Sequence, residues 1–147
     1  MKLFEALTKS KFDLIIDGDD LDFNPNKIAT TKQFLNFCID ELGLNEKFHC
    51  HIVSDREKYG IKTTAYYLDD GKVVMVYGKG RMLGDILRSV AHELVHQLQH
   101  EEERIEYPVQ DVGGEIEDEA NAKAGAIVKK FIKTQPGGKN LFESTIL

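Results

Sequence analysis

The chain has 147 residues, of which 41% are hydrophobic and 30% charged, and its formal net charge is −6. This length and balance are typical of one globular domain, and the acidic balance argues against nucleic-acid binding. No apolar run approaches the ~20 residues of a membrane span, and the N-terminus lacks the apolar stretch of a secretory signal. Two cysteines, Cys38 and Cys50, are too few for a disulfide framework, so we expect a cytoplasmic protein.

The first part of the chain predicts a mixture of helix and strand. An apolar segment at 1–17 forms a short element, and the Asn-Pro-Asn sequence at 24–26 predicts a turn. Apolar residues at helical spacing predict a helix over 30–42, with a threonine as its N-terminal cap. Alternating apolar residues predict a strand over 48–53, in which Cys50 faces the core.

The second part predicts two strands followed by two long helices. The strands cover 63–68 and 72–77, and an Asp-Asp-Gly turn between them predicts a hairpin. A broad apolar stripe predicts a helix from about 83 to 100. A loop with one proline and a pair of glycines precedes the last helix, which covers 115–133.

Together these elements predict a single α+β domain over 1–147. A sheet of three or four strands packs on helices, and the helix at 83–100 is central. The domain divides into a helix and strand portion (1–62), a core that carries the chemistry (63–133) and a C-terminal tail (134–147).

The pattern that carries chemistry is an HExxH motif, formed by His92, Glu93, Leu94, Val95 and His96. Residues four apart lie one above the other on a helix, so both imidazoles can bind one metal ion. Glu93 lies about 100° around the helix, beside the open metal position, where it can take a proton from bound water. Leu94 and Val95 are expected to face the core and anchor the helix.

A catalytic zinc ion also needs a third protein ligand. His100 shares the face of His92 and His96, but it lies about 12 Å from His92 along a straight helix. One ion cannot bind all three histidines. We therefore expect His100 at the surface or at the rim of a cleft.

The last helix offers a better third ligand. Glu117 and Asn121 share a face with the small residues Ala120 and Ala124, which would let this helix approach the motif helix closely. We prefer Glu117 as the ligand, with Asn121 holding a ligand imidazole through a hydrogen bond. Glu115 remains the alternative ligand.

HELVH followed by Glu-x-x-Ala-Asn at 117–121 resembles the gluzincin metallopeptidases, and most of all the small ImmA/IrrE-like type. The likeness covers about 63–131. It implies a zincin-like fold, in which the strand before the motif helix, here 72–77, is a sheet edge that pairs with extended substrate. The chain shows neither a DNA-binding or sensor domain nor a cysteine-rich zinc ribbon, so it resembles a stand-alone catalytic domain of a small phage or bacterial protein.

The resemblance also implies an activity. Zn²⁺ would be held by His92, His96 and Glu117, with Glu93 as general base in the hydrolysis of an intracellular protein or peptide. A catalytically silent, metal-bound module that binds a partner protein is the alternative function. Neither function involves nucleic acid or a membrane.

Zinc peptidases usually add a group that stabilises the oxyanion. Tyr107 is preferred because it lies in the loop between the two ligand helices. Tyr66, Tyr77, His100 and Arg88 remain alternatives, and the sequence does not choose among them. Arg88, like its neighbour Arg81, can also bind a substrate carboxylate, although a place on the helix surface is the preferred interpretation.

Overall fold

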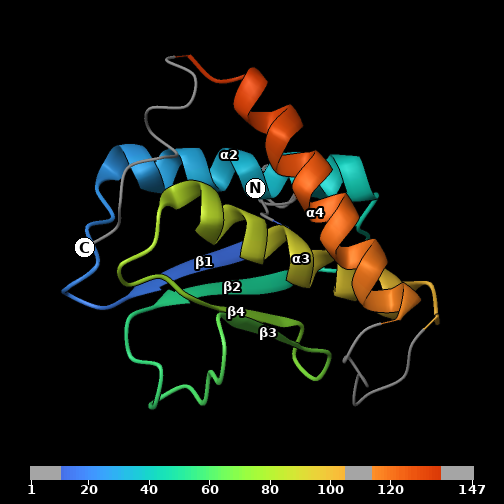
Figure 1. Cartoon of the computed structure of the whole chain (residues 1–147), viewed down its shortest axis with the longest axis horizontal. Coiled ribbons are helices and arrows are strands. Elements are labelled where there is room, and N and C mark those ends of the chain that lie inside the picture. The colour runs from blue at the N-terminus through green and yellow to red at the C-terminus, as the bar shows by residue number, and fades with distance from the viewer. Residues whose placement is uncertain (1–10, 105–113, 137–147) are drawn as a thin grey trace, which may run out of the picture.

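The computed structural model describes residues 11–104 and 114–136. Tyr107, the first ten residues and most of the predicted tail lie outside these ranges. The described residues form one α+β domain, in which the helices lie over one face of a mixed sheet (Figure 1). In chain order the elements are β1 (Phe12–Asp17), α2 (Pro25–Leu42), β2 (Phe48–Val53), β3 (Ala65–Leu68), β4 (Val73–Tyr77), α3 (Leu83–Glu101) and α4 (Glu115–Lys133).

The sheet has the strand order β1-β2-β4-β3. β1, β2 and β4 are parallel, with Cys50 opposite both Leu14 and Val74. β3 is antiparallel to β4, as the predicted hairpin requires. The prediction that 72–77 is a sheet edge is wrong, because β4 pairs with β2 on one side and with β3 on the other. Among the described strands, β1 and β3 form the two edges.

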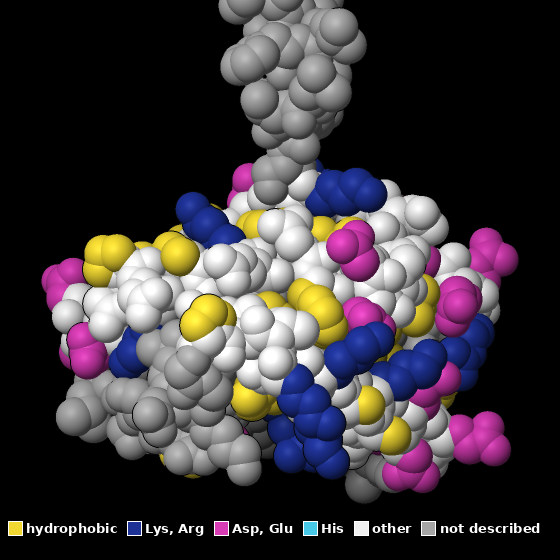
Figure 2. Space-filling model, turned by 90° about the horizontal axis from the view of Figure 1, so that it is seen from above, with side chains coloured by type: hydrophobic (Ala, Val, Ile, Leu, Met, Phe, Trp, Pro, Cys, Tyr) yellow, Lys and Arg dark blue, Asp and Glu magenta, His cyan; other side chains and the backbone are white. Residues whose placement is uncertain are grey.

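The core lies between the sheet and the three helices. Phe48, Cys50 and Ile52 alternate along β2 and are fully buried, which confirms the prediction for Cys50. They pack with apolar side chains of α2, α3 and α4 in one continuous cluster. On the face seen from above, acidic, basic and apolar side chains are interspersed and no histidine is visible (Figure 2).

α2 begins earlier than predicted. Asn24 accepts a hydrogen bond from the backbone N–H of Lys27 at 2.9 Å, and Pro25 occupies the first turn. Asn-Pro can mark a turn or a helix start, and here the capping role prevails because proline at this position loses no helical hydrogen bond. The predicted turn at 24–26 and the predicted threonine cap are therefore wrong.

α3 and α4 match the predicted helices closely and pack against each other. Ala120 and Ala124 of α4 are buried, so small side chains lie where the helices approach, as predicted. Leu94 and Val95 of α3 are fully buried, which confirms that they anchor the motif helix. Within the described ranges, no helix has the apolar length that crossing a membrane requires.

Candidate metal centre

The packing of α3 on α4 brings three metal-ligand side chains together. His92 and His96 of α3 and Glu117 of α4 each offer a ligand atom, and these atoms lie within 4.8 Å of one another. Glu117 is 2.8 Å from Nε2 of His96 and 3.1 Å from Nε2 of His92. This group can hold a metal ion. Residues 11–104 and 114–136 contain no second group of this kind.

Helix geometry explains the pairing of the two histidines. Four residues advance the chain by slightly more than one turn, so the two imidazoles project from the same face of α3. Their ring centroids are 4.9 Å apart and the rings are nearly perpendicular, at 84°. The helix alone, without α4, thus places two metal-binding nitrogen atoms together.

Gln99 fixes the orientation and the tautomer of His96. Its amide nitrogen donates to the backbone oxygen of Ile116 at 3.1 Å and to Glu119 at 2.8 Å. Its oxygen therefore accepts from Nδ1–H of His96, at 2.8 Å. Nε2 of the neutral imidazole then directs its lone pair toward Glu117. That contact is unfavourable unless a proton or a metal ion joins the two atoms, so the arrangement suits a metal ligand.

Gln99 was not predicted as a site residue, although its spacing from His96 is a usable signal. Gln99 follows His96 by three residues and therefore lies on the same helix face. It is fully buried although it is polar, which is costly without hydrogen-bond partners. A polar residue at this spacing after a ligand histidine is a candidate for a supporting role.

His92 has a supporting partner on α4. Asn121, which was predicted to hold a ligand imidazole, forms a side-chain hydrogen bond with His92. Burial lowers the pKa of His92, and the Glu117 carboxylate opposes this effect. Burial therefore favours the neutral imidazole, which is the form that binds a metal ion.

Glu117 and not Glu115 approaches the two histidines. Glu115 is exposed and is not part of the group. Glu119 is not part of the group either; it accepts a hydrogen bond from Gln99 and forms an ion pair with Arg104 at 2.8 Å. The hydrogen bond from Gln99 is the main cause of the lowered pKa of Glu119, so this carboxylate stays ionised.

A cavity of about 640 Å³ opens beside the three ligands. It lies between α3, α4 and the segment 63–68, which contains strand β3. Glu93 lines this cavity and is only 8% exposed, with its carboxylate 3.9 Å from Nε2 of His92. A buried carboxylate next to the ligand group can act as a general base.

Only some of the candidates for stabilising the oxyanion lie at the cavity. Tyr107, the preferred candidate, lies outside the described ranges. Tyr66 lines the cavity, but its hydroxyl donates to the backbone oxygen of Tyr59 at 2.8 Å. Tyr77 and His100 are not among the described residues that line the cavity, whereas Arg88 is.

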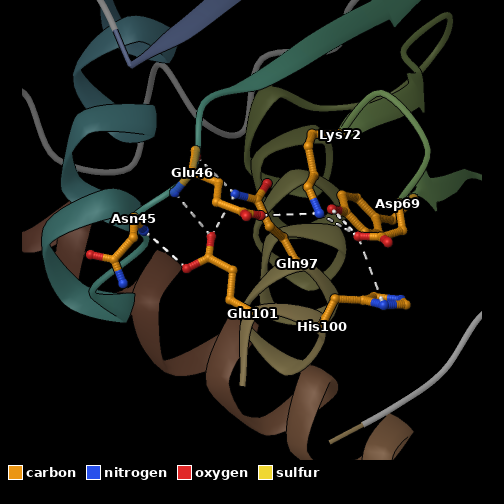
Figure 3. Close-up of polar contacts among 8 residues, drawn as sticks. Asn45, Glu46, Asp69, Lys72, Gln97, His100 and Glu101 are labelled. Atoms are coloured by element: carbon orange, nitrogen blue, oxygen red, sulfur yellow. Dashed lines mark hydrogen bonds and ion pairs between the residues drawn. The ribbon is translucent and has the colours of Figure 1, made fainter. Parts of the chain in front are cut away.

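The prediction that His100 lies at the surface or at a cleft rim is wrong. Its side chain is 6% exposed, and its ring lies 5.6 Å from the ring of Tyr67. Nδ1 is 3.8 Å from Asp69, in the hairpin turn between β3 and β4 (Figure 3). The sequence analysis missed this burial because the turn folds over the end of α3, which is a contact between distant segments. Burial is also the main cause of the lowered pKa of His100.

Further polar contacts hold the end of α3 to the sheet (Figure 3). The carboxylate of Glu101 accepts from the backbone N–H groups of Asn45 and Glu46, at 3.0 and 3.3 Å. Lys72 bridges Glu46 at 3.0 Å and Asp69 at 2.6 Å. These contacts fix the C-terminal part of α3 and thereby the helix that carries both histidines.

Comparison with family models, with curated proteins and with solved structures gave no match for this chain. The site itself is therefore the basis for a function. It has two histidines and a glutamate that can hold a metal ion, a buried carboxylate beside them and an adjoining cavity.

Proposed function

We propose that the protein is a zinc-dependent metallopeptidase of the cytoplasm that hydrolyses peptide bonds in a protein or peptide, with a zincin-like, gluzincin-type site. The observation that carries this proposal is the convergence of His92, His96 and Glu117 beside Glu93 in one cavity. Two imidazoles and one carboxylate are a ligand set of catalytic zinc sites, which keep a fourth position open. Zinc bound there would supply Lewis acidity, which activates water and polarises the scissile carbonyl.

Glu93 has the position of a proton carrier. As general base it takes a proton from the attacking water, and it then delivers that proton to the amine that leaves when the C–N bond breaks. Its burial supports this role, because proton transfer to a carboxylate is easier where water solvates the charge poorly. Asn121 and Gln99 hold the two imidazoles in place during the reaction.

The location of β3 supports a peptide as the substrate. Among the described strands β3 pairs only with β4, so no described strand covers its other edge, and residues 63–68 line the cavity. An extended peptide can add to such an edge through main-chain hydrogen bonds. The substrate would therefore lie along β3 rather than along β4, the strand that the sequence suggested.

The test is the loss of cleavage on Glu93→Gln. We expect zinc-loaded wild-type protein to cleave members of a random peptide library, detected by mass spectrometry. Glu93→Gln should keep its zinc and lose at least roughly a hundredfold in kcat/KM, because it removes the general base. Glu102→Gln, at an exposed position just after α3, is the matched control and should retain wild-type activity. Full activity of Glu93→Gln would exclude the mechanism.

The second candidate is a metal-bound module that binds a partner protein without turnover. Tyr66 lines the cavity and is a candidate for stabilising the oxyanion, but its hydroxyl already donates to the backbone oxygen of Tyr59. This favours binding without catalysis. Zinc-dependent cleavage of any library member would exclude this candidate. Zinc binding with no cleavage across the library would favour it.

A further inference from the structure

Arg88 lies at the junction of two cavities. It is exposed on α3 and precedes His92 by four residues, so it shares the helix face of the metal group. It lines the cavity that contains His92, Glu93 and Glu117. It also lines a second cavity of about 490 Å³ that follows α4 away from the metal group.

The guanidinium of Arg88 takes no part in holding the described residues together. In the described part of the chain no carboxylate lies within ion-pair distance of it, and its side chain forms no hydrogen bond with another described residue. The neighbouring Arg81 differs, because it donates to the backbone oxygen of Tyr77 at 2.7 Å and to the hydroxyl of Ser89 at 2.7 Å. Arg81 therefore has a structural role, whereas Arg88 is available to a ligand.

Gly125 of α4 lets this guanidinium approach the helix closely. A Cβ built at Gly125 would lie 3.4 Å from Nη2 of Arg88, so the guanidinium rests close to the α4 backbone. Glycine weakens a helix interior relative to alanine, and here it leaves this space open. The guanidinium of Arg88 therefore lies against α4, at the interface between α3 and α4.

The second cavity extends from Arg88 and Gly125 along one face of α4. Val128 and Ile132 are partly buried and form its apolar wall, whereas Lys129 and Lys133 are exposed basic residues at its border. A protein of net charge −6 thus presents a basic groove next to its metal group. Charge complementarity favours an acidic peptide segment as the occupant.

We propose that Arg88 binds an acidic side chain of the substrate, so that the peptidase prefers peptides with Glu or Asp near the scissile bond. The inference rests on the proposed peptidase function. A guanidinium can hold a carboxylate through two parallel N–H···O bonds, which gives direction as well as charge. Apolar residues that follow the acidic residue would lie against Val128 and Ile132, between the two lysines.

The experiment uses pairs of blocked peptides that differ only by Glu or Gln, chosen from the cleaved library members. Wild type should favour the Glu peptide by roughly tenfold or more in kcat/KM, mainly through KM. Arg88→Gln should lose this preference and Arg88→Lys should keep part of it. Lys32→Gln, which removes an exposed positive charge of α2 that lines neither cavity, should leave the preference intact.

Two results would overturn the inference and leave the peptidase function standing. One is equal cleavage of Glu and Gln peptides by wild type. The other is an equal loss of kcat on both peptides in Arg88→Gln, which would assign Arg88 to the oxyanion instead. If no library member is cleaved, binding of fluorescent Glu and Gln versions of the library to wild type and Arg88→Gln decides the question. Equal binding to both proteins would then overturn the inference.

Discussion

Each histidine of the metal group has a second partner that sets its orientation. Gln99 accepts from Nδ1–H of His96, and Asn121 forms a hydrogen bond with His92. Such partners fix the tautomer and the direction of the ligand nitrogen, so a metal ion would meet a preformed site. The metal-ligand group and its supporting partners thus comprise five side chains, of which three come from α3 and two, Glu117 and Asn121, come from α4.

The role of Gln99 can be tested by Gln99→Leu. This change removes the acceptor for Nδ1–H of His96, so the imidazole loses its fixed orientation. We expect zinc affinity to fall by roughly 10- to 100-fold, measured by competition with a chromophoric chelator. Gln97→Leu is the matched control, because Gln97 is equally buried on α3 but contacts Glu46 and Glu101 instead. Equal zinc affinity in both variants would contradict the assigned role.

The pairing of His92 with His96 could be predicted because it follows from helix spacing alone. Glu117 could be ranked above Glu115 because its face also carries alanines. The contacts of Gln99 could not be predicted in the same way, since Ile116 and Glu119 approach it only when α4 packs on α3. Local spacing thus gives the ligands, whereas the supporting hydrogen bonds require the tertiary structure.

At the element scale, the distance between α3 and α4 decides whether the three ligands meet. Small side chains keep these helices close, and Ala120 lies fully buried one turn from Glu117. A larger side chain here would separate the helices and move the Glu117 carboxylate away from the imidazoles. We therefore expect the geometry of the three ligand side chains to be sensitive to packing at positions such as Ala120, which is not one of the ligands.

Ala120→Leu tests this coupling. Overpacking a close helix contact should lower the free energy of unfolding by about 1–3 kcal/mol. It should also weaken zinc binding, because Glu117 is displaced. Ala122→Leu, at an exposed position of the same helix, should leave both unchanged. Urea unfolding and chelator competition measure the two effects, and unaltered zinc affinity in Ala120→Leu would contradict the coupling.

The bounds of helices and strands could be predicted better than the pairing of the strands. β2, α3 and α4 were predicted to within a residue or two, because alternation and helical periodicity are local patterns. The edge position of β3 was missed because it depends on the parallel pairing of β4 with β2, which lies far away in the sequence. The start of α2 was missed because Asn24-Pro25 is compatible with both a turn and a helix cap.

At the scale of the whole molecule, the β3–β4 hairpin and the end of α3 are joined through partly buried polar groups. His100 takes part in this contact, since its Nδ1 lies 3.8 Å from Asp69 (Figure 3) and its ring centroid lies 5.6 Å from that of Tyr67. Nε2 of His100 is buried and has no hydrogen-bond partner within the described residues. Protonating this ring inside the fold is therefore costly, and the lowered pKa of His100 reflects its burial.

This burial predicts a pH dependence for the zinc-free protein. The pKa of His100 in the unfolded chain is near 6.5, and it is lower in the folded protein. The unfolded chain thus binds more protons as the pH falls below 6.5, so the free energy of unfolding should decrease from pH 7.5 to 5.5. His100→Leu removes this contribution and should show a smaller decrease in urea unfolding with a chelator present. A decrease equal to that of wild type would contradict the prediction.

We propose that His92, His96 and Glu117 together hold one zinc ion, and elemental analysis of the purified protein can measure that ion. The wild-type protein, Glu117→Gln and Glu115→Gln would be incubated with equimolar zinc, washed by gel filtration and analysed by mass spectrometry. We expect one zinc per chain in wild type and in Glu115→Gln, whose substituted side chain is exposed. Glu117→Gln should retain clearly less. Wild-type protein that retains no zinc after this treatment would contradict the account.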